Sequence, residues 1–279
     1  MHRKSKIRVG GGSRDAYRHQ NVHVQAVQEQ REEISKQEVV NMSQIVFDTL
    51  CLEITRRCNM ACKHCLRGDA QLVDITHEII DKALENVTEI NNIVFTGGEP
   101  SLNIEAMRYT LDKCEEDGIF VGAFYVVTNG KQVEFDFIKT MLDWYVFCVD
   151  NGGDPEMCGL ALSKDDFHER ISAQNELLLR GVSFFREDKF QRGGTKWIIA
   201  EGRAADIPGA RTNEMRYLPA IDVYNKNEVK TISINDTIYV SADGKVVAGC
   251  DWSFENQAKH QLGTVFEQSD WLTELGYIA

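Results

Sequence analysis

From about residue 43 onward, two spacings of apolar residues alternate along the chain. Runs rich in β-branched and aromatic residues, typical of buried strands, are separated by stretches in which apolar residues recur every three or four positions, as on one face of a helix. Predicted strands are 45–54, 92–95, 120–127, 145–149, 159–162, 182–185 and 195–200. Predicted helices are 76–90, 104–116, 135–144 and 171–179. This order predicts an α/β fold around a parallel sheet, either an open sheet or a barrel.

The pattern changes near residue 217, after which β-rich runs follow one another without a helix. The runs 231–240 and 245–248 are joined by Ala242-Asp243-Gly244. An Asp-Gly pair between two β-rich runs is a strong signal for a hairpin. We therefore expect the core to cover 45–216 and a C-terminal extension to cover 217–279.

Residues 1–44 form a third part, expected to be a flexible basic extension. They are polar, carry three consecutive glycines, and hold eight Lys or Arg against five Asp or Glu. One interpretation is a basic arm for RNA or a leader peptide, and the other is a solvated tail.

Composition and charge narrow the class of protein. Of 279 residues, 43% are hydrophobic and 27% are charged, which is the ordinary balance of a soluble globular enzyme. The net charge of −12 argues against general nucleic-acid binding, which needs a basic surface. No apolar run approaches the length of a membrane helix, and the N-terminus lacks a secretory signal, so we expect a cytoplasmic protein.

The eight cysteines are better explained by metal binding than by disulfides. Disulfide-dense proteins are usually small and secreted, and this chain is expected to be neither. Three cysteines are clustered in Cys58-Asn-Met-Ala-Cys62-Lys-His-Cys65, directly after the first predicted strand. Three thiolates so close together can surround one soft metal centre. With three ligands, a four-iron cluster keeps one iron open, which suits catalysis.

Zinc is the competing metal for this loop. His64 could complete a Cys3His tetrahedron, although it directly adjoins Cys65. Structural zinc sites also usually draw their ligands from two separate segments of chain. Iron–sulfur binding is therefore favoured, with zinc left open.

Two further loops follow the second and third predicted strands. Thr96-Gly97-Gly98-Glu99-Pro100 and Thr128-Asn129-Gly130 both lie where parallel strands end, at the edge at which α/β proteins bind ligands. The glycines allow close approach of the backbone to a ligand, and Glu99 can accept hydrogen bonds from an ammonium group. Taken alone, either loop could be a simple turn.

Together, these motifs resemble the radical S-adenosylmethionine (SAM) superfamily. The cysteine spacing matches its signature loop, and Gly97-Gly98-Glu99-Pro100 matches its GGEP motif residue for residue. The resemblance implies a partial (β/α)6 TIM-like barrel, open on one side, with a small C-terminal β-hairpin subdomain. It also implies one [4Fe–4S] cluster held by Cys58, Cys62 and Cys65.

The resemblance implies that SAM binds the fourth iron and is cleaved by one electron to a 5′-deoxyadenosyl radical, which abstracts hydrogen from a substrate. The electron donor would be a protein such as flavodoxin or ferredoxin. No catalytic side chain is assigned. The implied SAM-binding residues are Gly97, Gly98, Glu99, Pro100, Thr128, Asn129, Ser163 and Arg203.

The last two of these residues rest on weaker matches. Ser163 lies in a Ser-x-Asp stretch, with Asp150 as the alternative end of the fourth strand. His168 is interpreted as a helix-start residue rather than a catalytic base. Arg203 follows Gly202 in a Gly-Arg-Ala element, and a structural salt bridge is its alternative role.

The C-terminal hairpin resembles the start of a SPASM or twitch extension, which holds auxiliary clusters on several cysteines. Cys250 is the one cysteine in that region, so we expect the hairpin without a second cluster. By analogy, the substrate is a peptide or protein side chain. A tRNA, nucleoside or small-molecule substrate stays open, as does a non-catalytic iron–sulfur or zinc protein.

Overall fold

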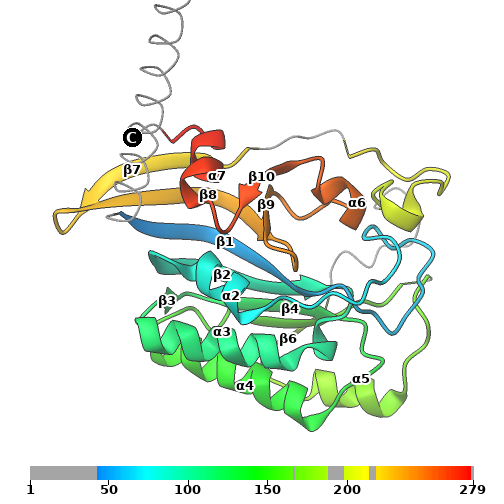
Figure 1. The fold of residues 1–279 in the computed structure, drawn as a ribbon. Helices are drawn as coiled ribbons and strands as arrows, with labels where there is room; N and C mark the ends of the chain where they lie inside the picture. Colours follow the sequence, from blue (N-terminus) through cyan, green and yellow to red (C-terminus); the bar gives the residue numbers. More distant parts are fainter. Residues whose placement is uncertain (1–42, 166, 188–197, 214–217, 278–279) are drawn as a thin grey trace, which may run out of the picture.

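The computed structural model describes residues 43–165, 167–187, 198–213 and 218–277 (Figure 1). The predicted N-terminal extension thus lies, up to residue 42, outside the described residues. The strands are β1 (Gln44–Thr55), β2 (Val87–Gly97), β3 (Phe120–Val121), β4 (Phe124–Thr128), β5 (Gly159–Leu162), β6 (Phe185–Arg186), β7 (Ala220–Lys226), β8 (Val229–Val240), β9 (Lys245–Ala248) and β10 (Gln261–Thr264). The helices are α2 (His77–Leu84), α3 (Ile104–Asp117), α4 (Phe135–Asp150), α5 (Ala173–Arg180), α6 (Phe254–Gln257) and α7 (Gln268–Glu274), with short 3-10 turns η1 (Pro100–Leu102) and η3 (Gly202–Ala204).

In the described part of the chain these strands form one sheet, in the order β10-β9-β8-β1-β2-β4-β5-β6, and outside this order β3 pairs with β2 and β7 with β8. Strands β1, β2, β4, β5 and β6 are neighbours in chain order, and each pair is parallel. The sheet is open, because β6 and β10 lie at its two ends. The predicted α/β class, with an open, parallel-rich sheet, is confirmed. Of the predicted strand 195–200, residues 195–197 lie outside the described residues, and Ile199 forms an isolated bridge with Arg211.

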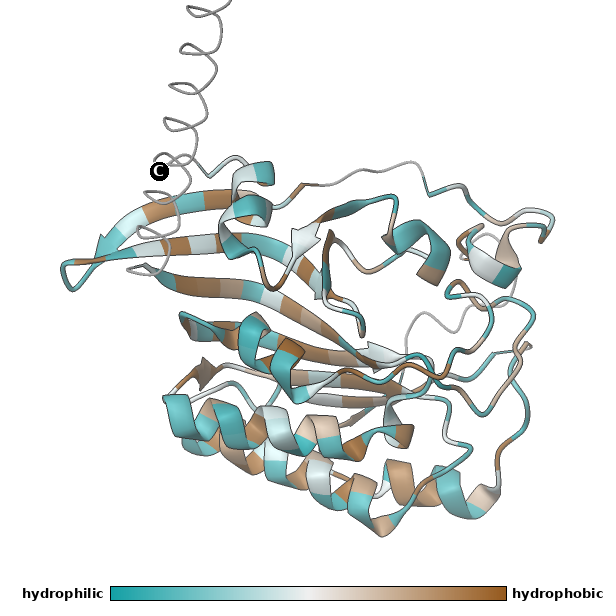
Figure 2. Cartoon of the chain, viewed as in Figure 1, coloured by the Kyte–Doolittle hydropathy of each residue, from teal (hydrophilic) through white to brown (hydrophobic). Residues whose placement is uncertain are grey.

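Helices α3 and α4 lie side by side against the parallel strands (Figure 1). Hydrophobic and hydrophilic bands alternate along both helices, as expected for helices with one buried face (Figure 2). Trp144 of α4 is fully buried, and its ring lies 5.1 Å from that of Phe95 on β2. Its indole N–H donates to the carbonyl of Met107 on α3 at 3.1 Å. This residue therefore joins both helices to the sheet. No helix in the described ranges has the length and apolar character needed to cross a bilayer.

The predicted strand 145–149 is wrong, because α4 continues through it to Asp150. The run is rich in β-branched and aromatic residues, which favoured a strand. However, Trp144, Phe147 and Cys148 continue the helical spacing of the buried residues Phe137 and Met141. Burial of this face against the sheet prevails over local propensity.

Helix α2 ends at Leu84, earlier than the predicted end at residue 90. The reason is Asn86, whose φ of 64° lies in the left-handed region and ends the helix. Val87 then begins β2, which pairs with β1 from Ile45 onward. The apolar residues at the end of the predicted helix thus belong to the strand.

The start of α2 gives a first prediction. The Thr76 hydroxyl accepts a hydrogen bond from the Ile79 N–H at 3.3 Å and so caps the N-terminus of the helix. Replacing Thr76 with alanine should lower the free energy of unfolding by about 1 kcal/mol, measured by urea denaturation. Thr76→Ser keeps an accepting hydroxyl and should lower it less. An equal loss in both variants would contradict the capping role.

The predicted strand 120–127 is divided into β3 and β4. The break falls at Gly122, where an added Cβ would lie 2.7 Å from the carbonyl oxygen of Asn91 on β2. Both short strands are parallel to β2. The close approach of the two backbones therefore requires glycine at this position.

The C-terminal hairpin forms as predicted, with β8 and β9 antiparallel. Strand β8 also pairs in parallel with β1, from Gln44↔Thr231 to Leu52↔Val240. The hairpin thus continues the central sheet and lies beside the strand that leads into the cysteine loop.

Candidate active site

A cavity of about 280 Å³ lies where the parallel strands end, at the loops that follow β1, β2, β4 and β5. The cysteine loop follows β1, and the Gly-Gly-Glu-Pro loop follows β2. Ten of the eleven predicted site residues line it: Cys58, Cys62, Cys65, Gly97, Gly98, Glu99, Pro100, Asn129, Ser163 and Arg203. Segments far apart in the sequence therefore meet at one cavity.

The three cysteines of the loop are free thiols, each partly exposed to this cavity. Burial and, to a smaller extent, the neighbouring Cys58 and Cys65 together raise the pKa of the Cys62 thiol to about 11. Burial also raises the pKa of the Cys58 thiol. Three thiolates this close repel one another unless a cation lies between them. The donor set thus fits a thiophilic metal centre such as an iron–sulfur cluster.

The glycines of the Gly-Gly-Glu-Pro loop allow that loop to pack against the start of the cysteine loop. An added Cβ at Gly97 would lie 2.0 Å from the carbonyl oxygen of Thr55, and one at Gly98 would lie 2.2 Å from that of Arg57. The sequence predicted close approach to a ligand at these positions. The close approach seen here is to the protein backbone, and it fixes the two loops against each other.

The Glu99 side chain is 1% exposed and is held by the protein itself. Its Oε1 accepts from the Ser101 N–H at 3.1 Å and from the Thr128 hydroxyl at 2.7 Å. Its Oε2 accepts from the Asn129 N–H at 2.7 Å. Burial raises the pKa of Glu99, while these donors oppose the rise. Glu99 therefore joins the loops that follow β2 and β4.

Replacing Glu99 with glutamine tests this connection. The glutamine places an N–H group where one carboxylate oxygen accepts a hydrogen bond, so one buried donor loses its partner. We expect the free energy of unfolding to fall by about 1–3 kcal/mol, measured by chemical denaturation. The matched control is Glu116→Gln on the exposed side of α3, which should change it by less than about 0.5 kcal/mol. Equal effects in the two variants would contradict the role given to Glu99.

Thr128 differs from the prediction that it lines the pocket. It is fully buried, donates to Glu99 and accepts from the Gly130 N–H at 3.0 Å. Both capacities of its hydroxyl are used within the protein, so Thr128 supports the wall of the cavity from behind.

Asn129 and Ser163 do face the cavity. The Asn129 amide donates to Asn59 Oδ1 at 2.8 Å and lies 3.9 Å from the sulfur of Cys58. Ser163 is held by its backbone N–H, which donates to the Thr128 carbonyl at 2.8 Å. The loop after β4 therefore contacts both the cysteine loop and the loop after β5.

Arg203 lies in the η3 turn, which is bound to the cysteine loop. Its backbone N–H donates to the Cys65 carbonyl at 2.9 Å, and an added Cβ at Gly202 would lie 2.4 Å from Leu66 O. One guanidinium nitrogen lies 3.3 Å from the exposed carboxylate of Asp69. The Nε of Arg203 is buried and has no hydrogen-bond partner among the described residues. It is thus a free donor at the cavity wall.

The alternative site residue Asp150 is excluded, because it is an exposed residue at the end of α4 rather than of a strand. The interpretation of His168 as a helix-start residue is also wrong, since Ser172 caps α5. His168 lies in the preceding loop and contacts Asp165 at 2.8 Å.

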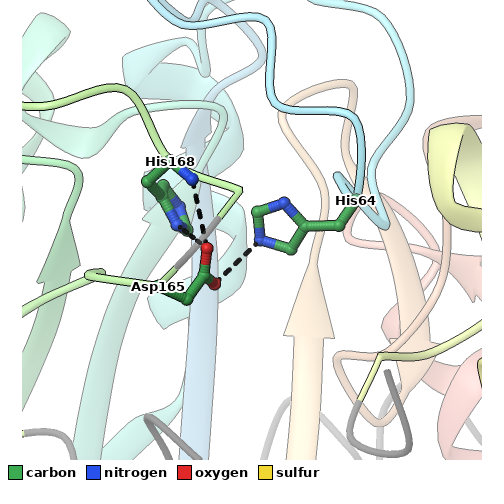
Figure 3. Close-up of side chains that lie close together, drawn as sticks. All are labelled: His64, Asp165 and His168. Carbon is green, nitrogen blue, oxygen red and sulfur yellow. Dashed lines mark hydrogen bonds and ion pairs between the residues drawn. The ribbon is translucent and has the colours of Figure 1, made fainter. Parts of the chain in front are cut away.

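His64 contacts the other oxygen of Asp165 at 3.2 Å, and both histidines line the cavity (Figure 3). Burial acts to raise the pKa of Asp165, but the bonds from His168 and His64 hold it well below its usual range. The sequence pointed to His64 and His168 separately, and to no contact of either with Asp165.

A buried polar network behind the cysteine loop was also not predicted. The fully buried Glu53 accepts from Arg56 at 2.5 Å, from Gln257 at 2.7 Å and from the hydroxyl of Tyr239. Arg56 also bonds to Asp243 in the hairpin turn at 2.8 Å. The network therefore connects the last residues before the cysteine loop to the C-terminal part of the sheet.

Comparison with known proteins gives one family match. The model of the Radical SAM superfamily matches residues 52–151, which include the cysteine loop and the loops after β2 and β4. The chain is also 31% identical over 71 residues to an uncharacterised protein of Methanocaldococcus jannaschii. That alignment covers 24% of this chain and 25% of the relative, so the match spans a quarter of the curated relative's length.

Two solved structures are similar at low identity. The structure described as native anSMEcpe with bound AdoMet and Cp18Cys peptide is 14% identical, with a TM-score of 0.45, covering 84% of this chain and 80% of that chain. Streptococcus suis SuiB is 13% identical, with a TM-score of 0.35, covering 90% of this chain and 70% of that chain. Both TM-scores are low, and nothing about the substrate of this chain follows from them.

Proposed function

We propose that this chain, whose residues 52–151 match the model of the Radical SAM superfamily, is an enzyme that cleaves SAM reductively and uses the resulting radical on a substrate. The observation that carries the proposal is the single cavity shared by the three thiols and the loops after β2, β4 and β5. Three cysteines line this cavity among the described residues, and no fourth one does. A four-iron cluster held there would keep one iron free for SAM.

The chemistry of the donor set supports one [4Fe–4S] cluster on Cys58, Cys62 and Cys65. When bound, the cluster and SAM would supply a 5′-deoxyadenosyl radical and methionine after transfer of one electron. We propose flavodoxin or ferredoxin as the electron donor. Soft thiolate ligands clustered in one loop favour iron–sulfur clusters. The raised pKa of the Cys62 thiol reflects repulsion between neighbouring thiolates as well as burial, and a cationic centre between them would relieve that repulsion.

The surrounding residues have two different roles in this proposal. Asn129, Ser163 and Arg203 offer polar groups to the cavity and are proposed to contact SAM, together with Gly97, Gly98 and Pro100. The buried Nε of Arg203 is a donor that an anionic group of a ligand could satisfy. Glu99 and Thr128 instead hold the loops in place through their mutual hydrogen bond.

Anaerobic reconstitution with iron and sulfide tests the activity. The brown protein, reduced with dithionite in place of the protein donor, should convert SAM to 5′-deoxyadenosine and methionine, measured by liquid chromatography and mass spectrometry. Colourless protein that holds zinc on the three cysteines would contradict the proposal. So would a protein with about four irons per chain that forms no 5′-deoxyadenosine.

A second cavity has room for a large polar substrate. We propose that this substrate is a peptide, modified on one of its side chains. Its volume is about 520 Å³, and it shares Arg67 and Arg203 with the cysteine cavity. Cationic, anionic and amide side chains line it, among them Lys259, Glu255 and Asn256. A peptide offers matching charges and amide groups. The proposed core (45–216) and C-terminal extension (217–279) both contribute to its walls.

Turnover tests this substrate class. Peptide mixtures should increase the rate of 5′-deoxyadenosine formation above the rate with SAM alone. Nucleosides and tRNA serve as the comparison, and stimulation by one of these but not by peptides would reject the peptide proposal. That result would leave the proposal of SAM cleavage intact.

A further inference from the structure

Two histidines and an aspartate meet at the wall of the cysteine cavity (Figure 3). His64 comes from the cysteine loop, whereas Asp165 and His168 come from the loop between β5 and α5. Nε2 of His64 lies 3.2 Å from one Asp165 oxygen, and Nδ1 of His168 lies 2.8 Å from the other. One ligand atom from each residue lies within 4.8 Å of the other two.

In the described part of the chain, the ion pairs of Asp165 are those with the two histidines, and none involves Lys or Arg. Its Oδ1 also accepts backbone N–H groups of Phe167 and His168. The ring of Phe167 lies beside that of His64, with the two ring centroids 5.0 Å apart. The carboxylate is thus positioned by the backbone and faces two imidazoles.

Besides the contact of its Nε2 with Asp165, the His64 ring has mainly contacts with other rings. Its Nδ1 is buried and has no hydrogen-bond partner among the described residues. Its ring contacts are with Phe167 and with His168, whose ring centroid is 4.7 Å away at an edge-on angle of 76°. The Nε2 side, toward Asp165 and His168, is therefore where the polar interactions of His64 are made.

We propose that His64, Asp165 and His168 bind one divalent transition-metal ion, at a site separate from the three cysteines. Two imidazole nitrogens and one carboxylate oxygen suit zinc and similar ions, whereas an iron–sulfur cluster takes thiolates. Donors bound tetrahedrally to one zinc ion lie about 3.4 Å apart, so the widest separation here, up to 4.8 Å, has to close by up to about 1.4 Å. Three protein ligands leave a position open, and both histidines line the cavity.

Zinc binding to the reconstituted holoenzyme tests this site. One equivalent of Zn²⁺ is added, unbound metal is removed by desalting, and zinc and iron are measured by mass spectrometry. We expect about one zinc per chain, with X-ray absorption showing nitrogen and oxygen ligands at about 2.0–2.1 Å and no sulfur shell at about 2.3 Å. His168→Ala and Asp165→Asn should each weaken zinc binding at least tenfold.

The matched control is His77→Ala, which removes another histidine in contact with a carboxylate, that of Glu105, on α2 and α3. It should leave zinc binding unchanged. The proposal would be overturned by a sulfur shell around zinc, or by full retention of zinc in both His168→Ala and Asp165→Asn. It would also be overturned if the wild type retained no zinc. In the last case the three residues form a hydrogen-bonded group only.

Iron content and 5′-deoxyadenosine formation are measured on the same preparations. Retained iron in His168→Ala and Asp165→Asn shows that those variants have folded. Absence of zinc binding in a wild type that cleaves SAM would reject the metal site alone. Zinc bound through nitrogen and oxygen in a protein that does not cleave SAM would support the metal site and reject the proposed function.

Discussion

Replacing Cys62 with serine is expected to abolish formation of 5′-deoxyadenosine and to remove most of the bound iron. Cys62 lies between the other two thiols in the loop, and its thiol titrates under the influence of both. A hydroxyl is a poor ligand for the iron of such clusters, which are held by thiolates. Two remaining cysteines cannot hold the cluster with one open iron. The loss should exceed a hundredfold in the rate of SAM cleavage.

The matched control is Cys250→Ser, which changes an exposed cysteine on the C-terminal side of the sheet. It should keep the iron content, the brown colour and the rate of SAM cleavage. If Cys62→Ser kept the wild-type iron content and activity, the three cysteines would not be the ligands. If Cys250→Ser lost iron to the same extent, the cysteine loop would not be the sole source of ligands.

The second large effect is expected at Glu53, the fully buried centre of the network behind the cysteine loop. Replacing it with alanine leaves the guanidinium of Arg56 buried at 6% exposure without its nearest carboxylate. Gln257 and Tyr239 lose an acceptor as well. Removing one partner of a buried ion pair typically costs about 3–5 kcal/mol of unfolding free energy.

Urea denaturation of the wild type and of Glu53→Ala measures this change in the free energy of unfolding. The control is Glu89→Ala, another glutamate on the parallel sheet, whose partner Lys226 is half exposed. That ion pair is exposed enough to contribute at most about 1 kcal/mol. If Glu53→Ala lost no more stability than Glu89→Ala, the network would not be a main connection between β1 and the C-terminal strands.

The parts of the site that could be predicted from the sequence are local ones. Cys58, Cys62 and Cys65 lie within eight residues, and Gly97 to Pro100 are consecutive, so their spacing alone indicated chemistry. Their meeting followed from the parallel order of the strands, because carboxyl ends of parallel strands share one edge. The helix predicted at 76–90 starts at Thr76, whose hydroxyl caps α2, and the one predicted at 104–116 ends close to Gly118, whose left-handed backbone caps α3.

What could not be predicted depends on residues distant in the sequence. Glu53 and Gln257 are 204 positions apart, and no local pattern pairs them. The contact of His64 with Asp165 depends on how two loops approach each other. The prediction of a strand at 145–149 was wrong for a related reason. Packing of α4 against the sheet, rather than the local composition, determines that this run is helical. Asn86 ended α2 early through a backbone angle that the apolar pattern does not report.

Electron paramagnetic resonance of the reduced protein tests the central claim most directly. The spectrum of the one-electron-reduced cluster is recorded with and without saturating SAM, under strictly anaerobic conditions. An iron that lacks a cysteine ligand and lies in the cavity is predicted to bind SAM, so the g values of the cluster should shift on its addition. An iron–sulfur spectrum that is identical with and without SAM would contradict the claim that this cavity holds a cluster open to SAM.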